Sequence, residues 1–266
     1  MKKLKIFAIL ALVGLSLASC SSSDKEEYWP NPDRGDYMKV SRMEVIRDVE
    51  KQHLLEALYT IEYNYFLKLH KLKEFQNVDL TALPAKAPIS YSFSYLKDDS
   101  LNKIVIKKDE EIDLDELTAS YQGGDLVSIK GKKEESEVLY QSVNANNLKV
   151  TQGYKTYDYE FDNTGNLIAV SDNTGRLFSY KYGVGHNPFE HSEYNLTFDY
   201  IPGGELIRFV KSSRNEIISA KNEKTGEELN FGYKLHDFGY PTEMIVNGST
   251  TKTLFKFEYN IIRERE

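Results

Sequence analysis

The chain has 266 residues, with 34 Lys and Arg against 41 Asp and Glu, and its formal net charge is −7 at pH 7. A net-acidic chain is a poor candidate for nucleic-acid binding, because affinity for phosphate comes from Lys and Arg. The single Cys excludes an internal disulfide and a cysteine-based metal site. With 12% aromatic residues, the composition predicts a folded chain that is large enough to bury a sizeable core.

The amino terminus has the organisation of an export signal. Residues 1–5 are rich in Lys, and residues 6–17 are mostly apolar. This apolar stretch is too short to span a bilayer, which takes about 20 apolar residues. The segment Leu17-Ala18-Ser19-Cys20 follows and contains the only Cys of the chain. This segment resembles the lipobox of bacterial lipoproteins.

The resemblance implies a lipid anchor. In lipoproteins the thiol of the Cys, here Cys20, receives a diacylglyceryl group, the peptide is cut before it, and the new amine is acylated. Residues 1–19 are then the signal peptide, and two or three acyl chains give stable anchoring. Residue 21 is Ser rather than Asp, which by the same resemblance predicts the outer membrane. Residues 21–27 are similar to the acidic tags of lipoproteins that are exposed on the cell surface.

Residues 20–37 are predicted to form a flexible tether behind this anchor. They are polar and contain Pro30, Pro32 and Gly35, a composition typical of linkers. The only Trp, Trp29, also lies here. Because sugar-stacking platforms commonly use Trp, its position weakens the case for glycan binding by the folded domain.

Residues 38–76 allow two interpretations. Ser41 and Glu44 fit a helical capping box, and apolar residues from Met43 to Ile61 recur at helical spacing. Against this, every odd position from 55 to 69 is apolar or aromatic, and most even positions are polar. Period-2 alternation of this length favours strand.

An internal comparison also favours strand. Residues 43–46 resemble residues 242–245, and residues 61–64 resemble residues 257–260. The second copy contains Asn247-Gly248, which is a strong hairpin signal. We therefore predict a hairpin over residues 40–65.

A degenerate repeat occupies the rest of the chain. Each unit has alternating aromatic residues, a turn that contains Gly, and a return strand with Leu-x-x-Ile, Val or Phe. The units begin at Tyr91, Ala119, Tyr157, Phe198 and Phe231. The turn Asp162-Asn163-Thr164-Gly165 recurs as Asp172-Asn173-Thr174-Gly175, which leaves a short strand between two turns and indicates an up-and-down meander.

These patterns predict an all-β domain over residues 38–266. We expect a long antiparallel up-and-down meander of roughly 14–18 strands that forms a curved sheet, a half-barrel or a barrel. Closing or curling would protect the sheet edges. Residues 77–88, which contain Pro84 and Pro88, are the best internal boundary and are interpreted as separating two sets of strands.

Two further resemblances concern the repeat. Residues 159–170 are similar to one unit of the tyrosine–aspartate repeat of Rhs-type shell proteins, but the other units match poorly and the chain is too short to enclose a cargo. The whole chain resembles outer-membrane lipoproteins that carry uncharacterised porin-like meanders. That resemblance implies a fold and a location, and it implies no reaction.

Candidate site residues gather in one loop, residues 183–195. His186, Glu190, His191 and Tyr194 are the predicted ligand contacts. Two His and one Glu are residue types that bind Zn²⁺ or Cu²⁺, but their spacing matches no metalloenzyme helix and Pro188 opposes one. We interpret the loop as a polar contact surface and predict no metal.

A second polar segment, residues 108–117, contains an acidic run that Ca²⁺ ions could use. It lacks the central Gly of an EF-hand, so a solvated acidic loop is the default interpretation. No Gly-x-Ser-x-Gly motif and no phosphate-binding Gly loop occurs in the chain. The sequence therefore predicts no catalytic residues and no cofactor.

The sequence thus favours a non-enzymatic lipoprotein, anchored in the outer membrane and exposed on the cell surface, with a binding or structural role. A glycan, a lipid or a protein is the expected partner. Two alternatives stay open: an envelope hydrolase that acts on glycan or lipid, which needs two converging carboxylates, and a carrier that shields an acyl chain.

Overall fold

The computed structural model describes residues 37–47, 54–64, 68–81, 88–98, 100–132, 137–189, 213–248 and 252–262. Cys20 with the rest of residues 1–36, His53, Glu190, His191, Tyr194 and the repeat unit at Phe198 lie outside these ranges. Within them, no helix is long and apolar enough to cross a membrane.

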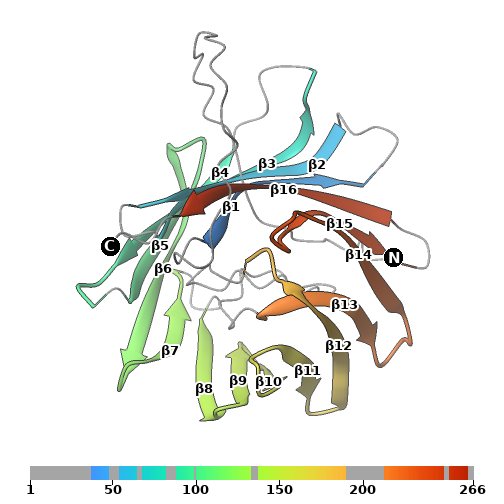
Figure 1. The fold of residues 1–266 in the computed structure, drawn as a ribbon. Coiled ribbons are helices and arrows are strands. Elements are labelled where there is room, and N and C mark those ends of the chain that lie inside the picture. Colours follow the sequence, from blue (N-terminus) through green and yellow to red (C-terminus); the bar gives the residue numbers. More distant parts are fainter. Residues whose placement is uncertain are drawn as a thin grey trace.

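The described strands form one closed antiparallel barrel (Figure 1). Each strand pairs with the next along the chain, and β1 pairs with β16, with Tyr37 opposite Ile262. This confirms the predicted meander and shows which of the three expected shapes it takes. The strands are β1 (Tyr37–Ile46), β2 (Leu54–Tyr63), β3 (Leu69–Asp79), β4 (Ile89–Tyr95), β5 (Leu101–Lys108), β6 (Ile112–Gln122), β7 (Asp125–Lys130), β8 (Val138–Asn144), β9 (Asn147–Gln152), β10 (Lys155–Phe161), β11 (Leu167–Asp172), β12 (Gly175–His186), β13 (Asn215–Asn222), β14 (Glu228–Leu235), β15 (Pro241–Asn247) and β16 (Lys252–Ile262).

The predicted hairpin over residues 40–65 is present as β1 and β2, and the helical alternative is wrong. The alternation from 55 to 69, however, is not one strand. The chain turns after Tyr63, and Asn64 closes the turn: its backbone N–H donates to the Lys68 carbonyl (2.8 Å), and its side-chain oxygen accepts from the Lys68 N–H (2.9 Å). The hydrophobic pattern continues across the turn because β2 and β3 both place apolar side chains inside.

The repeated Asp-Asn-Thr-Gly turns have the predicted chemistry. Asp162 Oδ1 accepts from the backbone N–H groups of Thr164 (2.8 Å) and Asn166 (2.9 Å). Gly165 has a φ of 90°, a conformation that favours glycine. Asp172 accepts from the Thr174 N–H in the same way (2.8 Å). Local side-chain capping therefore defines both ends of β11.

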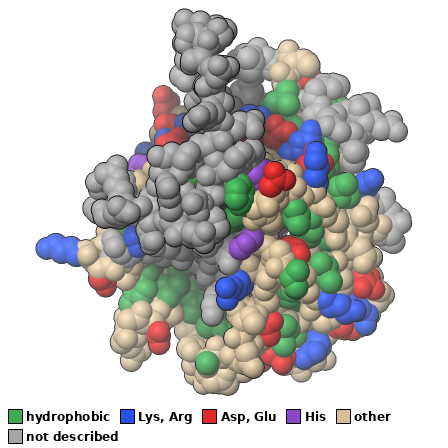
Figure 2. Space-filling model, in the orientation of Figure 1, with side chains coloured by type: hydrophobic (Ala, Val, Ile, Leu, Met, Phe, Trp, Pro, Cys, Tyr) green, Lys and Arg blue, Asp and Glu red, His purple; other side chains and the backbone are tan. Residues whose placement is uncertain are grey.

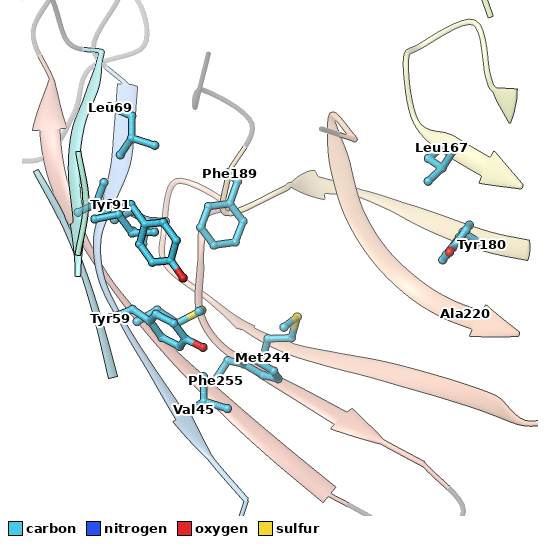
Figure 3. Packing of buried hydrophobic residues seen from close by; sticks show 14 of the residues in the cluster. Val45, Tyr59, Leu69, Tyr91, Leu167, Tyr180, Phe189, Ala220, Met244 and Phe255 are labelled. Atoms are coloured by element: carbon cyan, nitrogen blue, oxygen red, sulfur yellow. The ribbon is translucent and has the colours of Figure 1, made fainter. Parts of the chain in front are cut away.

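Most apolar side chains point into the barrel and most polar ones point out, and a second, smaller set of apolar side chains (Ile46, Leu55, Leu58, Val78 and Leu254) is buried as a separate cluster. On β10, Tyr159 and Phe161 are buried, whereas Asp158 and Glu160 face outward and pair with Lys149 of β9 and Arg176 of β12. All sixteen described strands contribute to a single apolar cluster, either with buried or with partly buried side chains. Figure 3 shows members of this cluster pointing inward from opposite walls, with Phe189 between them. On the visible surface in Figure 2, acidic, basic and apolar side chains are interspersed.

One carboxylate faces the interior from β3. Glu74 is 3% exposed, and it accepts hydrogen bonds from the Gln76 amide (2.7 Å) and the Tyr91 hydroxyl (3.3 Å). Burial raises the pKa of Glu74 above its ordinary value of 4.5, although both hydrogen bonds oppose the shift. A carboxyl with a raised folded-state pKa favours folding while it is protonated, and this contribution is lost as the pH rises from the unfolded-state pKa towards the folded-state pKa.

Glu74→Gln is therefore expected to make the change of stability with rising pH more favourable than in the wild type. The unfolding free energy can be measured by urea denaturation between about pH 4.5 and 7. As the pH rises, that of the wild type should decrease relative to that of the variant. The comparison isolates Glu74, because other carboxyls titrate in both chains. Glu227→Gln, at an exposed turn position, is the control and should keep the wild-type slope. Equal slopes in all three chains would show that Glu74 is solvated.

Candidate functional site

Of the predicted contact residues, the structure describes His186. It ends β12, and its ring stacks on Tyr240 with a centroid distance of 4.6 Å and an interplanar angle of 9°. Tyr240 lies just before β15 and makes an edge contact with Tyr259 of β16 (5.7 Å). In the described part of the chain, no group of three or more His, Cys, Asp or Glu side chains could hold a metal ion. His186 therefore joins an aromatic cluster at this end of the barrel.

A bulge in β12 lies directly before His186. Tyr182 pairs with Ile217 and His186 pairs with Asn215, so residues 183–185 of β12 stand opposite the single residue Glu216 of β13. A Cβ atom at Gly183 would clash with Glu216 Oε1, and one at Gly185 would lie 3.0 Å from both carboxylate oxygens. The two glycines thus leave the room that the Glu216 side chain occupies.

Glu216 is buried in this bulge. It is 9% exposed, and its Oε2 atom has no hydrogen-bond partner among the described residues. The side chain lines a cavity of about 30 Å³. The described residues of the cavity lining include three tyrosines and one phenylalanine but no Lys or Arg. They are Tyr180, Tyr182, Asn187, Pro188, Phe189, Ser213, Glu216, Ile217, Tyr233 and Met244.

The neighbouring hydroxyl groups are directed elsewhere. Tyr233 donates its hydroxyl hydrogen to the Ile217 carbonyl (2.6 Å), and Tyr182 donates to the Leu167 carbonyl (2.7 Å). Ser213 Oγ donates to Tyr182 (2.8 Å). Burial, followed by the nearby charge of Glu216, raises the pKa of Tyr233 well above its ordinary value. Tyr182 and Tyr233 therefore line the same cavity as the carboxylate, while their hydroxyl hydrogens are donated to backbone carbonyls.

Sequence reasoning missed Glu216. The predicted loop over residues 183–195 begins too early, because residues 183–186 belong to β12. Glycines inside a strand mark a bulge or a close approach, and this was the available signal. This signal does not indicate which residue approaches. Glu216 lies on β13, which begins at Asn215, 30 residues after Gly185.

A larger groove of about 530 Å³ crosses the strands where the barrel closes. The register places Lys234, Glu243, Lys256 and Glu44 in a row of alternating charge across β14, β15, β16 and β1. Lys234 pairs with Glu243 (3.6 Å), and Arg42 pairs with both Glu44 (2.7 Å) and Glu258 (3.5 Å). These carboxylates have cationic partners, so the groove is lined by a network of ion pairs across the strands where β1 pairs with β16.

The acidic run at 108–117 forms part of the β5–β6 hairpin. Glu110 reaches Lys71 (2.9 Å) and Lys73 (2.8 Å) of β3. Hydrogen bonds from these lysines lower the pKa of Glu110 to about 2. Protein cations thus stand where the calcium hypothesis would place an ion.

Comparison with known proteins gives fold-level neighbours. The chain is similar to a porin-like protein from Bacteroides uniformis ATCC 8492, with 15% identity and a TM-score of 0.40, over 83% of this chain and 96% of that chain. It is also similar to a porin-like protein from Bacteroides vulgatus ATCC 8482, with 12% identity and a TM-score of 0.37, over 84% of this chain and 99% of that chain. No protein-family model and no curated protein matches the sequence.

Proposed function

We propose that this chain is an outer-membrane lipoprotein, anchored through Cys20, whose barrel lies in water and serves as a non-enzymatic binding or structural module. The observation that carries the proposal is the polarity of the barrel wall. Its inward side chains form an apolar cluster, and its outward side chains include ion pairs between different strands. Examples are Lys103–Glu116 (2.9 Å), Lys149–Asp158 (3.7 Å), Arg176–Glu160 (2.9 Å) and Lys234–Glu243 (3.6 Å).

This arrangement is the reverse of a membrane-spanning barrel. Transmembrane barrels have an outward apolar band, and a Lys or Arg on the lipid-facing side costs roughly 2–4 kcal/mol at the bilayer midplane. Outward cations occur here on β5, β9, β12 and β14, so no rotation of the barrel would hide them all from lipid. A barrel of this kind needs a separate attachment to stay at a membrane, and the lipobox resemblance at Cys20 offers one.

The position of β1 fits such a tether. β1 begins at Tyr37, 17 residues after Cys20 by subtraction of the residue numbers, and a fully extended segment of this length spans about 60 Å. Since Tyr37 pairs with Ile262, the tether joins the end of the barrel where β16 ends. The same end carries His186 and the turn between β14 and β15.

The proposed role is binding rather than hydrolysis. Three carboxylates of the groove, Glu44, Glu243 and Glu258, are paired with Arg or Lys. Glycoside hydrolysis needs two carboxyl groups, one protonated acid and one free base or nucleophile. Each of these three carboxylates is already engaged by a cation of the protein, so the groove favours a structural or contact surface.

Cys20→Ala is expected to move the protein from the membrane fraction to the soluble fraction when the full chain is expressed in a Gram-negative host. The wild-type protein should sediment with membranes and require detergent, because its acyl chains anchor it. The variant should remain soluble without detergent, with an unchanged far-ultraviolet circular dichroism spectrum. Ser22→Ala is the control and should stay anchored. A Cys20→Ala variant that still sediments with membranes and needs detergent would show that the barrel itself is embedded, and the proposal would be wrong.

A further inference from the structure

We propose that the cavity beside Glu216 binds the ammonium group of a primary amine ligand. This inference names a ligand class for the binding role proposed above and rests on that role. Its evidence is separate from that for the anchor, because it comes from the β12 bulge alone.

The carboxyl group of Glu216 brings an unpaired oxygen into the cavity. Glu216 is 9% exposed, and its Oε2 atom lacks a hydrogen-bond partner among the described residues. A buried carboxylate without a partner is costly. The lining of the cavity contains no Lys or Arg, so the described part of the chain provides no cation inside the cavity. A ligand that brings one positive charge would satisfy the site.

The volume of the cavity matches a primary ammonium group. The cavity of about 30 Å³ accommodates a group about as large as one water molecule. A primary ammonium group has this size, whereas a quaternary ammonium group with four carbon substituents is much larger. The glycines at 183 and 185 leave room for the Glu216 side chain itself, because a Cβ atom at either position would press on its carboxylate.

The walls of the cavity are aromatic and carry phenol oxygens. Tyr180, Tyr182, Tyr233 and Phe189 line the cavity, and aromatic rings attract cations. The Tyr233 hydroxyl donates its hydrogen to a backbone carbonyl (2.6 Å), which leaves its oxygen as an acceptor. An ammonium group has three donors and no acceptor, and it therefore matches a carboxylate that stands beside phenol oxygens.

The donor set fits an ammonium group better than a divalent metal ion. Ca²⁺ takes six to eight oxygen ligands, several of them from carboxylates. Glu216 is the only acidic side chain among the described residues that line the cavity. One carboxylate balances one positive charge, which an ammonium group supplies.

The test measures the thermal midpoint of the full chain in mild detergent, so that it does not depend on whether Cys20 is lipidated. Methylammonium chloride is the probe, and sodium chloride, calcium chloride and tetramethylammonium chloride are compared with it at equal ionic strength. We expect methylammonium to raise the midpoint in a saturable way, by about 2–4 °C well above its dissociation constant. Sodium, calcium and tetramethylammonium should not reproduce this rise.

Two variants locate the effect. Glu216→Gln should abolish the methylammonium shift, and Glu227→Gln, at an exposed turn position, should keep it. A shift that persists in Glu216→Gln, or that is matched by sodium, calcium or tetramethylammonium in the wild-type chain, would overturn the proposal. If Glu216→Gln does not fold, the wild-type comparison of methylammonium with tetramethylammonium decides alone, and equal midpoints would also overturn it. Failure here would leave the Cys20 fractionation result unchanged.

Discussion

Phe255→Ala is expected to lower the free energy of unfolding by about 3–5 kcal/mol, the usual cost of removing a phenylalanine side chain from a packed core. Phe255 lies on β16 and is 0% exposed. It stands opposite Val45 of β1 and Met244 of β15, both of which belong to the same apolar cluster. Since single domains are stable by about 5–15 kcal/mol in total, the variant should be close to the limit of folding. Urea denaturation should show a lower midpoint with an unchanged slope.

Glu258→Ala is the matched control for this prediction. Glu258 lies on the same strand but on the outer face, where its side chain is 64% exposed and pairs with Arg42 at 3.5 Å. An exposed ion pair of this kind contributes at most about 1 kcal/mol, so the variant should stay near wild-type stability. If Phe255→Ala were no more destabilising than Glu258→Ala, the interior would have to be a solvated channel rather than a core.

Removal of β1 is expected to abolish folding, whereas removal of the segment before it should not. A chain that begins at residue 47 lacks Val40, Met43, Val45 and Ile46, which are at most 2% exposed. It would also leave β2 and β16 as unpaired edges, since β1 pairs with both. Unpaired edges of this length favour aggregation. We expect this truncation to be insoluble or to lack a cooperative thermal transition.

A chain that begins at residue 37 is the control, because it keeps every described strand. It should be soluble without detergent and should unfold cooperatively near the wild-type midpoint. Size-exclusion chromatography and circular dichroism distinguish the two truncations. A folded, monomeric chain from residue 47 would contradict the barrel closure, because it would show that β1 is dispensable.

The patterns of the repeat units were readable because their causes are local. Alternation of side chains on a strand and capping of a turn by Asp depend on residues only a few positions apart. Tyr157, Tyr159 and Phe161 therefore indicated β10, and Asp162 indicated its turn, without any knowledge of distant contacts. Where the local signal was ambiguous, as from 55 to 69, the alternation hid a turn. Odd-numbered residues of β2 and the first residue of β3 point inward, so the alternation continues from one strand into the next and resembles a single long strand.

The candidate site was far less predictable. The sequence pointed to His186 through its residue type, and the structure places that ring on Tyr240. The carboxylate of the cavity, Glu216, carries no motif. Its position depends on a register shift between Tyr182 and His186, which sets three residues of one strand against one of the other. A bulge changes which face a side chain occupies, and neither composition nor periodicity records it.

The sequence by itself determined the all-β class, the hairpins and the polarity of each strand, because these follow from hydrogen bonding and side-chain period over a few residues. Only the tertiary structure decided that residues 37–46 pair with residues 252–262 and close the sheet. It also decided that every strand contributes apolar side chains to one interior cluster, and that Glu216 is buried against two glycines. Pairing between strands distant in the sequence depends on summed packing and on register around the whole barrel, and no short segment contains that information.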